Sequence, residues 1–331
     1  MAPSRREVRA FVEQVKKEIA EKASRPTRVR RARLPKEEIF PAMVCFVDLL
    51  GFGTKVKEIA SSVDLYSTRD ELRVVHDLFL KDPKGLLERE SAKSLAREVW
   101  AFSDCLVIVI PLRSQAVEEE GTLGVIVSEL NDLSLAHADC MGKGILLRGG
   151  VSFGLWFRQG DFMISPALVE AHDVEQEVSL PVIGLAPRLK DLLVRAARRT
   201  RDPRYLSSFP KIKTKRGFCR FLDYCGDLLA ELPGDMGPEG RAEYKRTRDE
   251  KKRRAIFERG VHRQFRKWLR WHRNTILNRA QQAGDGPVRR KYEWLKAYHN
   301  RHVKRCGKEF RPFRIGTLSD RPGPIGGRVI R

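Results

Sequence analysis

The sequence predicts an α+β fold, in which a ferredoxin-like sheet carries its helices on one face. The first observation is the order of the expected elements: strand, helices, hairpin, helix, strand, which is the order of a split βαβ sheet. The second is a hydrophobic fraction of 41% in 331 residues, enough for a sizeable core. The third is the helical periodicity beyond Pro238, which adds a helical C-terminal region to the sheet.

Apolar runs and their spacing predict the individual elements of the central region. The expected elements are a strand (42–49), helical segments (54–96), two strands that meet near Asp104 (97–110), a helix (122–141), a strand (144–153), a helix (166–177), a short strand (180–184) and a helix (187–199). The segment KTKRGFCRFLDY (213–224) could add a further strand. These elements together predict a sheet with helical connections.

The positive charge is concentrated at the two ends of the chain. Residues 1–40 carry 12 Lys/Arg against 6 Asp/Glu, residues 41–240 carry 25 against 29, and residues 241–331 carry 28 against 8. This division predicts a basic amphipathic helix and linker (1–40), a nearly neutral domain (41–226), a basic helical C-terminal region (227–315) and a flexible tail (316–331).

The sequence contains neither a run of about 18 apolar residues, as a membrane helix requires, nor a secretory signal in its first residues. The six cysteines are scattered without CxxC spacing, and we expect reduced thiols in a cytoplasmic protein. His299 and His302 lack further metal-ligating companions, and we expect them on a helix surface.

Asp48 closes the apolar run PAMVCFVD directly before a glycine-containing turn and a helix. Its carboxylate is well placed to hold a divalent cation, while Gly51 and Gly53 let the backbone approach a ligand. The N–H groups at the start of the following helix favour phosphate oxygens. The alternative is that Asp48 serves only as a helix-capping or turn residue.

Asp104 interrupts an otherwise apolar hairpin that continues as LVIVI. A carboxylate at the tip of a core hairpin is costly unless a cation offsets its charge. A tight turn that tolerates Asp is the alternative interpretation. If Asp104 and Asp48 converge, they can hold two divalent ions, and such a pair serves phosphoryl chemistry on nucleotides.

Three segments that contain or follow these residues resemble a known family. They are FVDLLGF (46–52), FSDC (102–105) and LRGGVSFG (147–154), and they are similar to the successive motifs of class III nucleotidyl cyclases. With SPALVEAHDVE (165–175) and KYEWLKAYHN (291–300), the chain most resembles the bacterial pyrimidine cyclases of Pycsar antiphage systems. The resemblance implies a class III cyclase-type sheet and a catalytic domain over residues 41–226.

The resemblance also implies roles for individual residues. Asp48 and Asp104 match the two metal-binding aspartates, and Leu49 matches the residue whose carbonyl completes a metal shell. Arg148 matches a triphosphate-binding arginine; a surface arginine at a strand end is the alternative. The phosphate-binding turn corresponds to Gly51, Phe52, Gly53 and Thr54, although Gly53 stands where the family often has a hydroxyl residue.

The residues that select the base and stabilise the charge of the reaction are identified less directly than the two aspartates. Trp100 lies where purine cyclases have a base-reading residue, and its indole could favour a pyrimidine; a core-facing tryptophan is the alternative. The Asn and Arg that purine cyclases place on the next helix have no counterpart in residues 169–174. Another cation must take their place. Lys215, in a loop with Lys213 and Arg216, resembles the family's phosphate-contacting loop, and the basic C-terminal segment is another source of positive charge.

The sequence therefore predicts an enzyme that uses two divalent ions, Mn²⁺ or Mg²⁺, to convert a nucleoside triphosphate, UTP or CTP, into a 3′,5′-cyclic nucleotide and pyrophosphate. The resemblance implies a homodimer, a separate effector that responds to the cyclic nucleotide, and antiphage defence. One alternative is a palm-type enzyme that joins nucleotides into linked products. Another is a nucleic-acid-binding protein that uses the basic residues 241–331, among them HRQFRKWLRWHR (262–273).

Overall fold

A computed structural model describes residues 38–80, 97–113, 115–160, 162–201, 204–283 and 286–320. The expected N-terminal helix and linker, the end of the segment 54–96, and the tail from residue 321 onward lie outside these ranges. The described residues of 39–157 and 163–320 form one compact unit, while Glu38 and residues 158–162 belong to a second unit.

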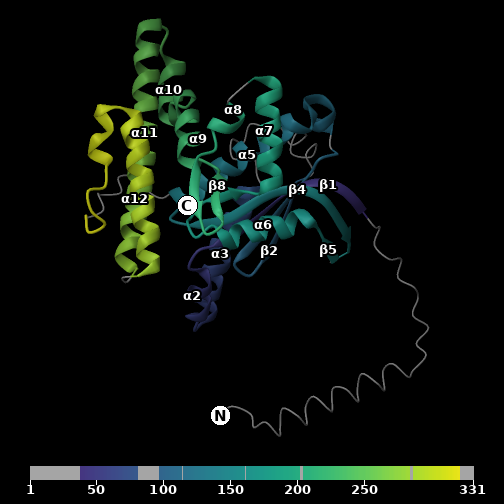
Figure 1. Cartoon of the computed structure of the whole chain (residues 1–331). Coiled ribbons are helices and arrows are strands. Elements are labelled where there is room, and N and C mark those ends of the chain that lie inside the picture. The colour runs from purple at the N-terminus through teal and green to yellow at the C-terminus, as the bar shows by residue number, and fades with distance from the viewer. Residues whose placement is uncertain are drawn as a thin grey trace, which may run out of the picture. The chain divides into compact units, whose positions relative to one another are not determined.

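The protein has a mixed α+β architecture with a central sheet and surrounding helices (Figure 1). The strands are β1 (Glu38–Leu49), β2 (Glu98–Phe102), β3 (Cys105–Pro111), β4 (Leu147–Gln159), β5 (Phe162–Ile164), β6 (Ile183–Leu185), β7 (Lys211–Thr214) and β8 (Gly217–Phe221). The helices are α2 (Phe52–Lys57), α3 (Ser62–Leu80), α5 (Gln115–Gly142), α6 (Pro166–Glu177), α7 (Pro187–Thr200), α8 (Arg204–Ser207), α9 (Tyr224–Glu231), α10 (Gly237–Arg246), α11 (Glu250–Gln282) and α12 (Pro287–Cys306), with 3₁₀ turns η1 (Leu232–Gly234) and η2 (Lys308–Phe313).

The strands are ordered β2-β3-β1-β4-β6-β8-β7 across the sheet. β3 pairs antiparallel with both β1 and β2. The order β2-β3-β1-β4 is that of a split βαβ sheet, as the sequence predicts. β6 pairs parallel with β4 and antiparallel with β8. These strands extend the sheet beyond the four strands β2-β3-β1-β4. The segment 213–224 contributes to the hairpin of β7 and β8 rather than a single strand.

The predicted elements differ from the observed ones mainly at their ends. α6 has the expected bounds, because Ser165 caps its first turn by accepting a hydrogen bond from the Leu168 N–H at 3.3 Å and Pro166 follows at the first helical position. α5 begins seven residues before the expected start, although Gly121 interrupts it with φ 75° and ψ 156°. β4 continues six residues past the expected end.

The helices do not all lie on one face of the sheet, which corrects that part of the prediction. Alternate residues of β1 point to opposite faces, and both sets are buried. Met43, Cys45 and Val47 pack in a core with residues of α3, α5 and α7. Ala42 and Val44 pack in a second core that includes Ala167 of α6. α6 therefore covers the opposite face of the sheet.

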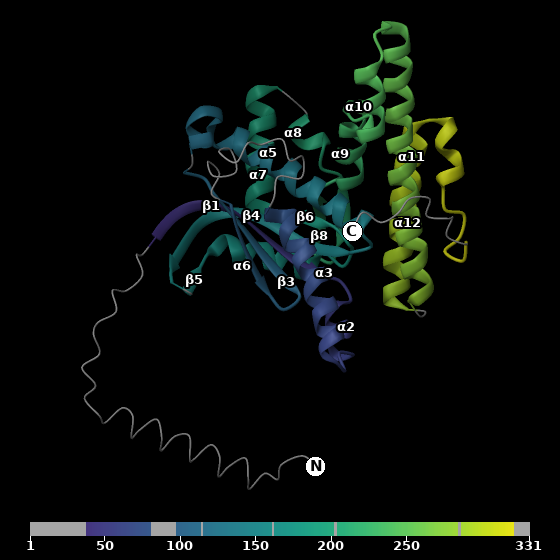
Figure 2. The same ribbon diagram turned by 180° about the vertical axis from the view of Figure 1, so that it is seen from behind.

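The C-terminal helices pack against the sheet domain through a third core. α11 and α12 lie side by side in both views (Figures 1 and 2). Their buried apolar residues share a cluster with residues of α5, α6, α9 and β8, including Met141, Val174, Phe221, Trp268 and Leu295. The predicted boundary at residue 226 stays a prediction, and this shared core spans it.

His299 and His302 are 0% and 1% exposed, so the expectation of a helix surface is wrong. One ring nitrogen of His299 lies 2.9 Å from a ring nitrogen of His272, and His302 lies 3.1 Å from a carboxylate oxygen of Asp223. These polar groups contact one another inside the shared core. No helix among the described residues combines the length and apolar character that crossing a membrane requires.

Candidate functional site

Asp48 is the penultimate residue of β1 and lies opposite Cys105 in the pairing of β1 with β3. Since side chains alternate along a strand, it points to the same face as Ala42 and Val44, which is the face that α6 covers. The Asp48 side chain is 18% exposed. The end of β1 thus places a partly buried carboxylate at the edge of the region between the sheet and α6.

Asp104 lies in a two-residue turn between β2 and β3, because Phe102 pairs with Cys105 across the hairpin. Ser103, the other turn residue, has φ 55°, a left-handed conformation typical of such short connections. The Leu49 N–H donates a hydrogen bond of 2.9 Å to the Asp104 carbonyl. This main-chain bond joins the hairpin tip to the end of β1, which brings the two aspartates together.

The side chains of Asp48, Asp104 and Cys105 each offer a ligand atom, and these atoms all lie within 4.8 Å of one another. Two carboxylates are the hard oxygen donors that Mg²⁺ and Mn²⁺ prefer. Burial, followed by the nearby Asp104 and Asp48 carboxylates, raises the pKa of the Cys105 thiol to about 12. The thiol therefore stays protonated near neutral pH, and the two carboxylates are the groups that fit a divalent ion.

Arg148, near the start of β4, lies directly beside this pair. Its guanidinium donates a hydrogen bond of 3.1 Å to the Asp48 carboxylate and makes an ion pair with Glu175 of α6. Gly149 next to it allows the approach, because a Cβ at this position would lie 2.4 Å from the Phe46 carbonyl oxygen in β1. The buried Nε of Arg148 has no hydrogen-bond partner among the described residues. The guanidinium thus keeps an unused hydrogen-bond donor.

The carboxylates around Arg148 are harder to ionise than ordinary ones. The pKa of Asp48 is raised, and burial is the largest cause. Arg148 lowers this pKa through its charge and its hydrogen bond, whereas the charge of Asp104 raises it. The pKa of Glu175 is also raised, first by burial, although Arg148 opposes the change. The arginine thus offsets only part of the cost of placing these carboxylates together, and a divalent cation would offset more.

A second cation, Lys291 of α12, contributes to the same electrostatic environment. Its pKa is lowered, first by burial and then by Arg148, whereas Asp48 and Glu175 act in the opposite direction. Lys291 in turn lowers the pKa of Asp48. The first turns of α12 therefore add a half-buried ammonium group to the site from the C-terminal region of the chain.

The predicted phosphate turn lies beside the aspartates. Gly51 has φ 83° in the turn after β1, and α2 begins at Phe52. Gly53 faces Asp104, since a Cβ there would lie 3.7 Å from a carboxylate oxygen. The side chains of Leu49 and Phe52 are buried in the core, so only their main-chain groups can face a ligand. The Thr54 side chain is outside the described part of the structure.

Trp100 lies in β2 opposite Val107 of β3. It is half-buried on the same sheet face as Asp48, where it packs at the margin of the core beneath α6, and its indole N–H donates to Glu98 at 3.3 Å. Trp100 and Asp48 thus share a face of the sheet. Both predicted roles of Trp100, core residue and base-contacting residue, are compatible with this position.

Lys215 lies several strands away from the aspartates across the sheet. It lies exposed in the turn between β7 and β8, and β7 is the edge strand separated from β1 by β4, β6 and β8. With neighbouring strands about 4.8 Å apart, β7 is about 19 Å from β1. Within one chain the fold brings together Asp48, Asp104 and Arg148, but it does not place Lys215 among them.

Sequence reasoning missed three residues of the site: Cys105, Glu175 and Lys291. Each lies within a segment that carries the resemblance, Glu175 as the last residue of 165–175 and Lys291 as the first residue of 291–300. For Glu175 and Lys291, the available signal was a charged residue at an end of such a segment. The charged groups that Glu175 and Lys291 contact depend on how α6 and α12 pack against the sheet.

No protein-family model matches the sequence, and no curated protein matches it. Among solved structures, a bacterial light-regulated adenylyl cyclase aligns with a TM-score of 0.36 and 11% identity, over 67% of this chain and 65% of that chain. The chain therefore spans less than two thirds of that relative.

Two further solved structures are catalytic domains. The catalytic core of a rhodopsin-guanylyl cyclase with converted specificity, in complex with ATPαS, aligns with a TM-score of 0.35 and 12% identity, over 56% of this chain and 96% of that chain. A dimeric guanylyl cyclase domain from the aquatic fungus Blastocladiella emersonii aligns with a TM-score of 0.34 and 12% identity, over 57% and 97%. At these values the similarity assigns neither a family nor an activity.

Proposed function

We propose that this chain is a metal-dependent nucleotidyl cyclase, which converts UTP or CTP into a 3′,5′-cyclic nucleotide and pyrophosphate. The observation that carries the proposal is the meeting of Asp48 and Asp104, from the end of β1 and the tip of the β2-β3 hairpin, within 4.8 Å of each other. A pair of oxygen donors beside an arginine fits phosphoryl transfer from a triphosphate. The motif resemblance around both residues agrees with this chemistry.

In the proposed reaction, the ribose 3′-oxygen forms a bond to the α-phosphorus, the bond from that phosphorus to the β-phosphate oxygen breaks, and the hydroxyl proton is released. Asp48, Asp104 and the Leu49 carbonyl would hold two Mg²⁺ or Mn²⁺ ions. When bound, such ions lower the pKa of the attacking hydroxyl and neutralise the phosphate oxygens. The backbone from Gly51 to Gly53 would approach the phosphates at the start of α2.

Arg148 has a role that follows from its contacts. It neutralises Asp48 in the structure at 3.1 Å. When Asp48 holds a cation, Arg148 no longer has to balance that carboxylate, and its guanidinium can turn to a phosphate oxygen while Glu175 retains it at the site. Lys291 supplies a second positive charge nearby, and we propose that it replaces the cation that purine cyclases place on the helix after the strand with the triphosphate-binding arginine, which is β4 in this chain.

The finer parts of the proposal follow from the resemblance to Pycsar cyclases: a pyrimidine base, a homodimer, a cytoplasmic location, and a second messenger that a separate effector reads during phage infection. Trp100, on the face of the sheet that carries Asp48, would contact the base. The distance of Lys215 from Asp48 within one chain is compatible with a dimer in which a second copy brings its Lys215 to the triphosphate.

The activity test uses purified protein with each of the four nucleoside triphosphates and Mn²⁺, with product identification by mass spectrometry. We expect a cyclic mononucleotide and pyrophosphate, with UTP or CTP as the best substrate. Linked dinucleotides would instead support the palm-type alternative. Size measurement in solution tests the dimer, and cyclic nucleotide levels in producing cells before and after phage infection test the proposed defence role.

Variants identify the residues responsible. Asp48→Asn and Asp104→Asn should each lower product formation by a factor of about 100 or more, because metal-ion catalysis contributes several kcal/mol. Both should also abolish thermal stabilisation by Mn²⁺. The control is Asp191→Asn, which removes an exposed carboxylate of α7 whose ion pair is with the adjacent Lys190. Full activity of either site variant would refute the proposal.

A further inference from the structure

The long helix α11 has two chemically different faces. Trp268, Leu269, His272 and Ile276 are buried against the rest of the chain. The opposite face carries most of the charge, since the 33 residues of α11 contain eleven Lys/Arg and two Glu. An exposed helix face of this composition needs either water or a polyanion as its partner.

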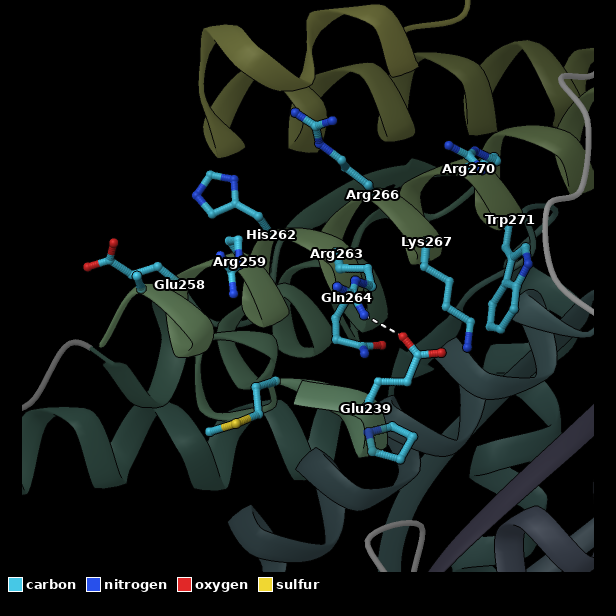
Figure 3. A pocket seen from close by; sticks show the side chains of 13 residues that line it. Glu239, Glu258, Arg259, His262, Arg263, Gln264, Arg266, Lys267, Arg270 and Trp271 are labelled. Carbon is cyan, nitrogen blue, oxygen red and sulfur yellow. Dashed lines mark hydrogen bonds and ion pairs between the residues drawn. The ribbon is translucent and has the colours of Figure 1, made fainter. Parts of the chain in front are cut away.

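The exposed face of α11 borders a groove of about 880 Å³ (Figure 3). α10 forms the other wall and is held very close, since a Cβ on Gly260 of α11 would lie 2.6 Å from the Met236 Cβ beside the start of α10. Arg259, Arg263, Arg266, Lys267 and Arg270 of α11 line the groove. Its basic wall is thus part of a closely packed pair of helices.

The carboxylates of the groove balance only some of these charges. Glu239 pairs with Arg263, and Glu243 lies 2.9 Å from Arg259, both from α10. Arg266, Lys267 and Arg270 have no ion-pair partner among the described residues. Eleven helical steps separate Arg259 from Arg270, so the basic stripe is about 17 Å long. That length spans several phosphates of a nucleic acid strand.

An aromatic side chain lies at the same end of the groove as the unbalanced cations. The Lys267 ammonium is 4.6 Å from the centre of the Trp271 ring. A Cβ on Gly142, at the end of α5, would lie 3.8 Å from Trp271, so the indole is supported on one side and half-exposed on the other. A supported aromatic ring next to a basic stripe suits the stacking of an unpaired base.

The surroundings of the groove favour nucleic acid over a membrane surface. An interfacial helix needs large apolar side chains beside its basic ones. The exposed large hydrophobic residues of the described chain include none from α10 or α11. A phosphodiester strand needs only the cations and a stacking surface, and both are present.

We propose that the groove between α10 and α11 binds single-stranded nucleic acid, with Arg266, Lys267 and Arg270 on its phosphates and Trp271 against a base. This site lies on elements other than those that carry Asp48 and Asp104, so it goes beyond the proposed cyclase activity. Removal of residues 241–331 would expose the core that α11 and α12 share with α5 and α9. Point variants of the full chain are therefore the appropriate test.

The experiment measures fluorescence anisotropy of labelled single-stranded RNA and DNA of mixed sequence, about 20 nucleotides long, with the full chain. Potassium chloride is varied between about 50 and 200 mM. The test variant combines Arg266→Gln, Lys267→Gln and Arg270→Gln. The control combines Arg195→Gln, Arg198→Gln and Arg199→Gln, which removes the same charge from exposed positions of α7.

We expect the test variant to bind at least about tenfold more weakly, with a salt slope smaller by about 2, because each phosphate contact on a single strand contributes about 0.7. The control should stay within about twofold of the original chain, since its arginines lie outside the groove. Trp271→Leu should weaken binding by about tenfold with the salt slope unchanged, since it removes stacking and no charge. Thermal melting confirms that each variant is folded.

Four outcomes would overturn the proposal. The first is no binding by the original chain at about 100 mM salt. The second is an equal loss in the two triple variants, which would indicate attraction by overall charge. The third is binding of a duplex of the same sequence as tightly as the single strand. The fourth is binding to vesicles of phosphatidylcholine and phosphatidylserine without binding to nucleic acid.

Discussion

Replacing Arg148 by Met tests the electrostatics of the site without any assumption about substrate. The side chains of Arg148 and Asp48 are 21% and 18% exposed, and the ion-pair atoms lie 3.1 Å apart. Arg148 also pairs with Glu175, whose side chain is 1% exposed. The variant therefore leaves two carboxylates, partly or fully buried, without their main counter-charge.

The expected cost lies between two limits. Exposed ion pairs contribute about 0–1 kcal/mol. Breaking a fully buried pair costs about 3–5 kcal/mol. With Arg148 and Asp48 about one fifth exposed, we expect a loss of about 2–3 kcal/mol in the free energy of unfolding at pH 7.5. The control Arg188→Met breaks a pair with Glu170 at 3.0 Å, in which the side chains are 47% and 31% exposed. That loss should be below about 1 kcal/mol.

The pH dependence has a definite sign. The pKa values of Asp48 and Glu175 are raised in the folded chain. Each carboxyl group therefore contributes stability that is present below its unfolded pKa of about 4 and is lost as pH rises through the folded pKa. Without Arg148 both folded pKa values rise further, and more stability is lost over this range.

The assay is urea unfolding followed by circular dichroism, from about pH 4 to 7.5. The difference between the original chain and Arg148→Met should be small near pH 4 and reach about 2–3 kcal/mol at pH 7.5. A variant as stable as the original at pH 7.5 would refute the reasoning, and so would a difference of the same size at every pH.

Three further predictions concern other residues. Lys291→Gln should lower product formation about tenfold, because it removes a cation near Asp48, and Lys291→Arg should restore part of the rate. The control Lys296→Gln removes an ion pair with Glu293 at 2.8 Å on the same helix and should leave product formation unchanged. Asp223→Ala should cost about 2–4 kcal/mol in urea unfolding, because it leaves Tyr298 and His302 without their buried acceptor, whereas Asp320→Ala near the surface should cost less than about 1 kcal/mol. Cys105 should react with Ellman's reagent much more slowly than an ordinary thiol at pH 8, because its pKa is about 12; rapid labelling of the original chain, absent from Cys105→Ser, would contradict this.

The sequence by itself determined the local features of the fold and of the site. The two apolar runs around Phe102 and Cys105 define a hairpin, and the polar break between them places Asp104 at its tip. The bounds of α6 follow from Ser165 and Pro166. These features are encoded within a few residues of one another, so periodicity and capping reveal them without knowledge of the fold.

Only the tertiary structure decided which groups these features meet. Periodicity shows that a face of α6 is buried, but not that it covers the side of the sheet opposite α3, α5 and α7. Arg148 and Asp48 are 100 residues apart, and their contact depends on the pairing order of the strands. The burial of His299 and the position of Lys291 likewise depend on how α12 packs. Such contacts are set by the shape of surfaces assembled from distant parts of the chain, which local sequence patterns do not encode.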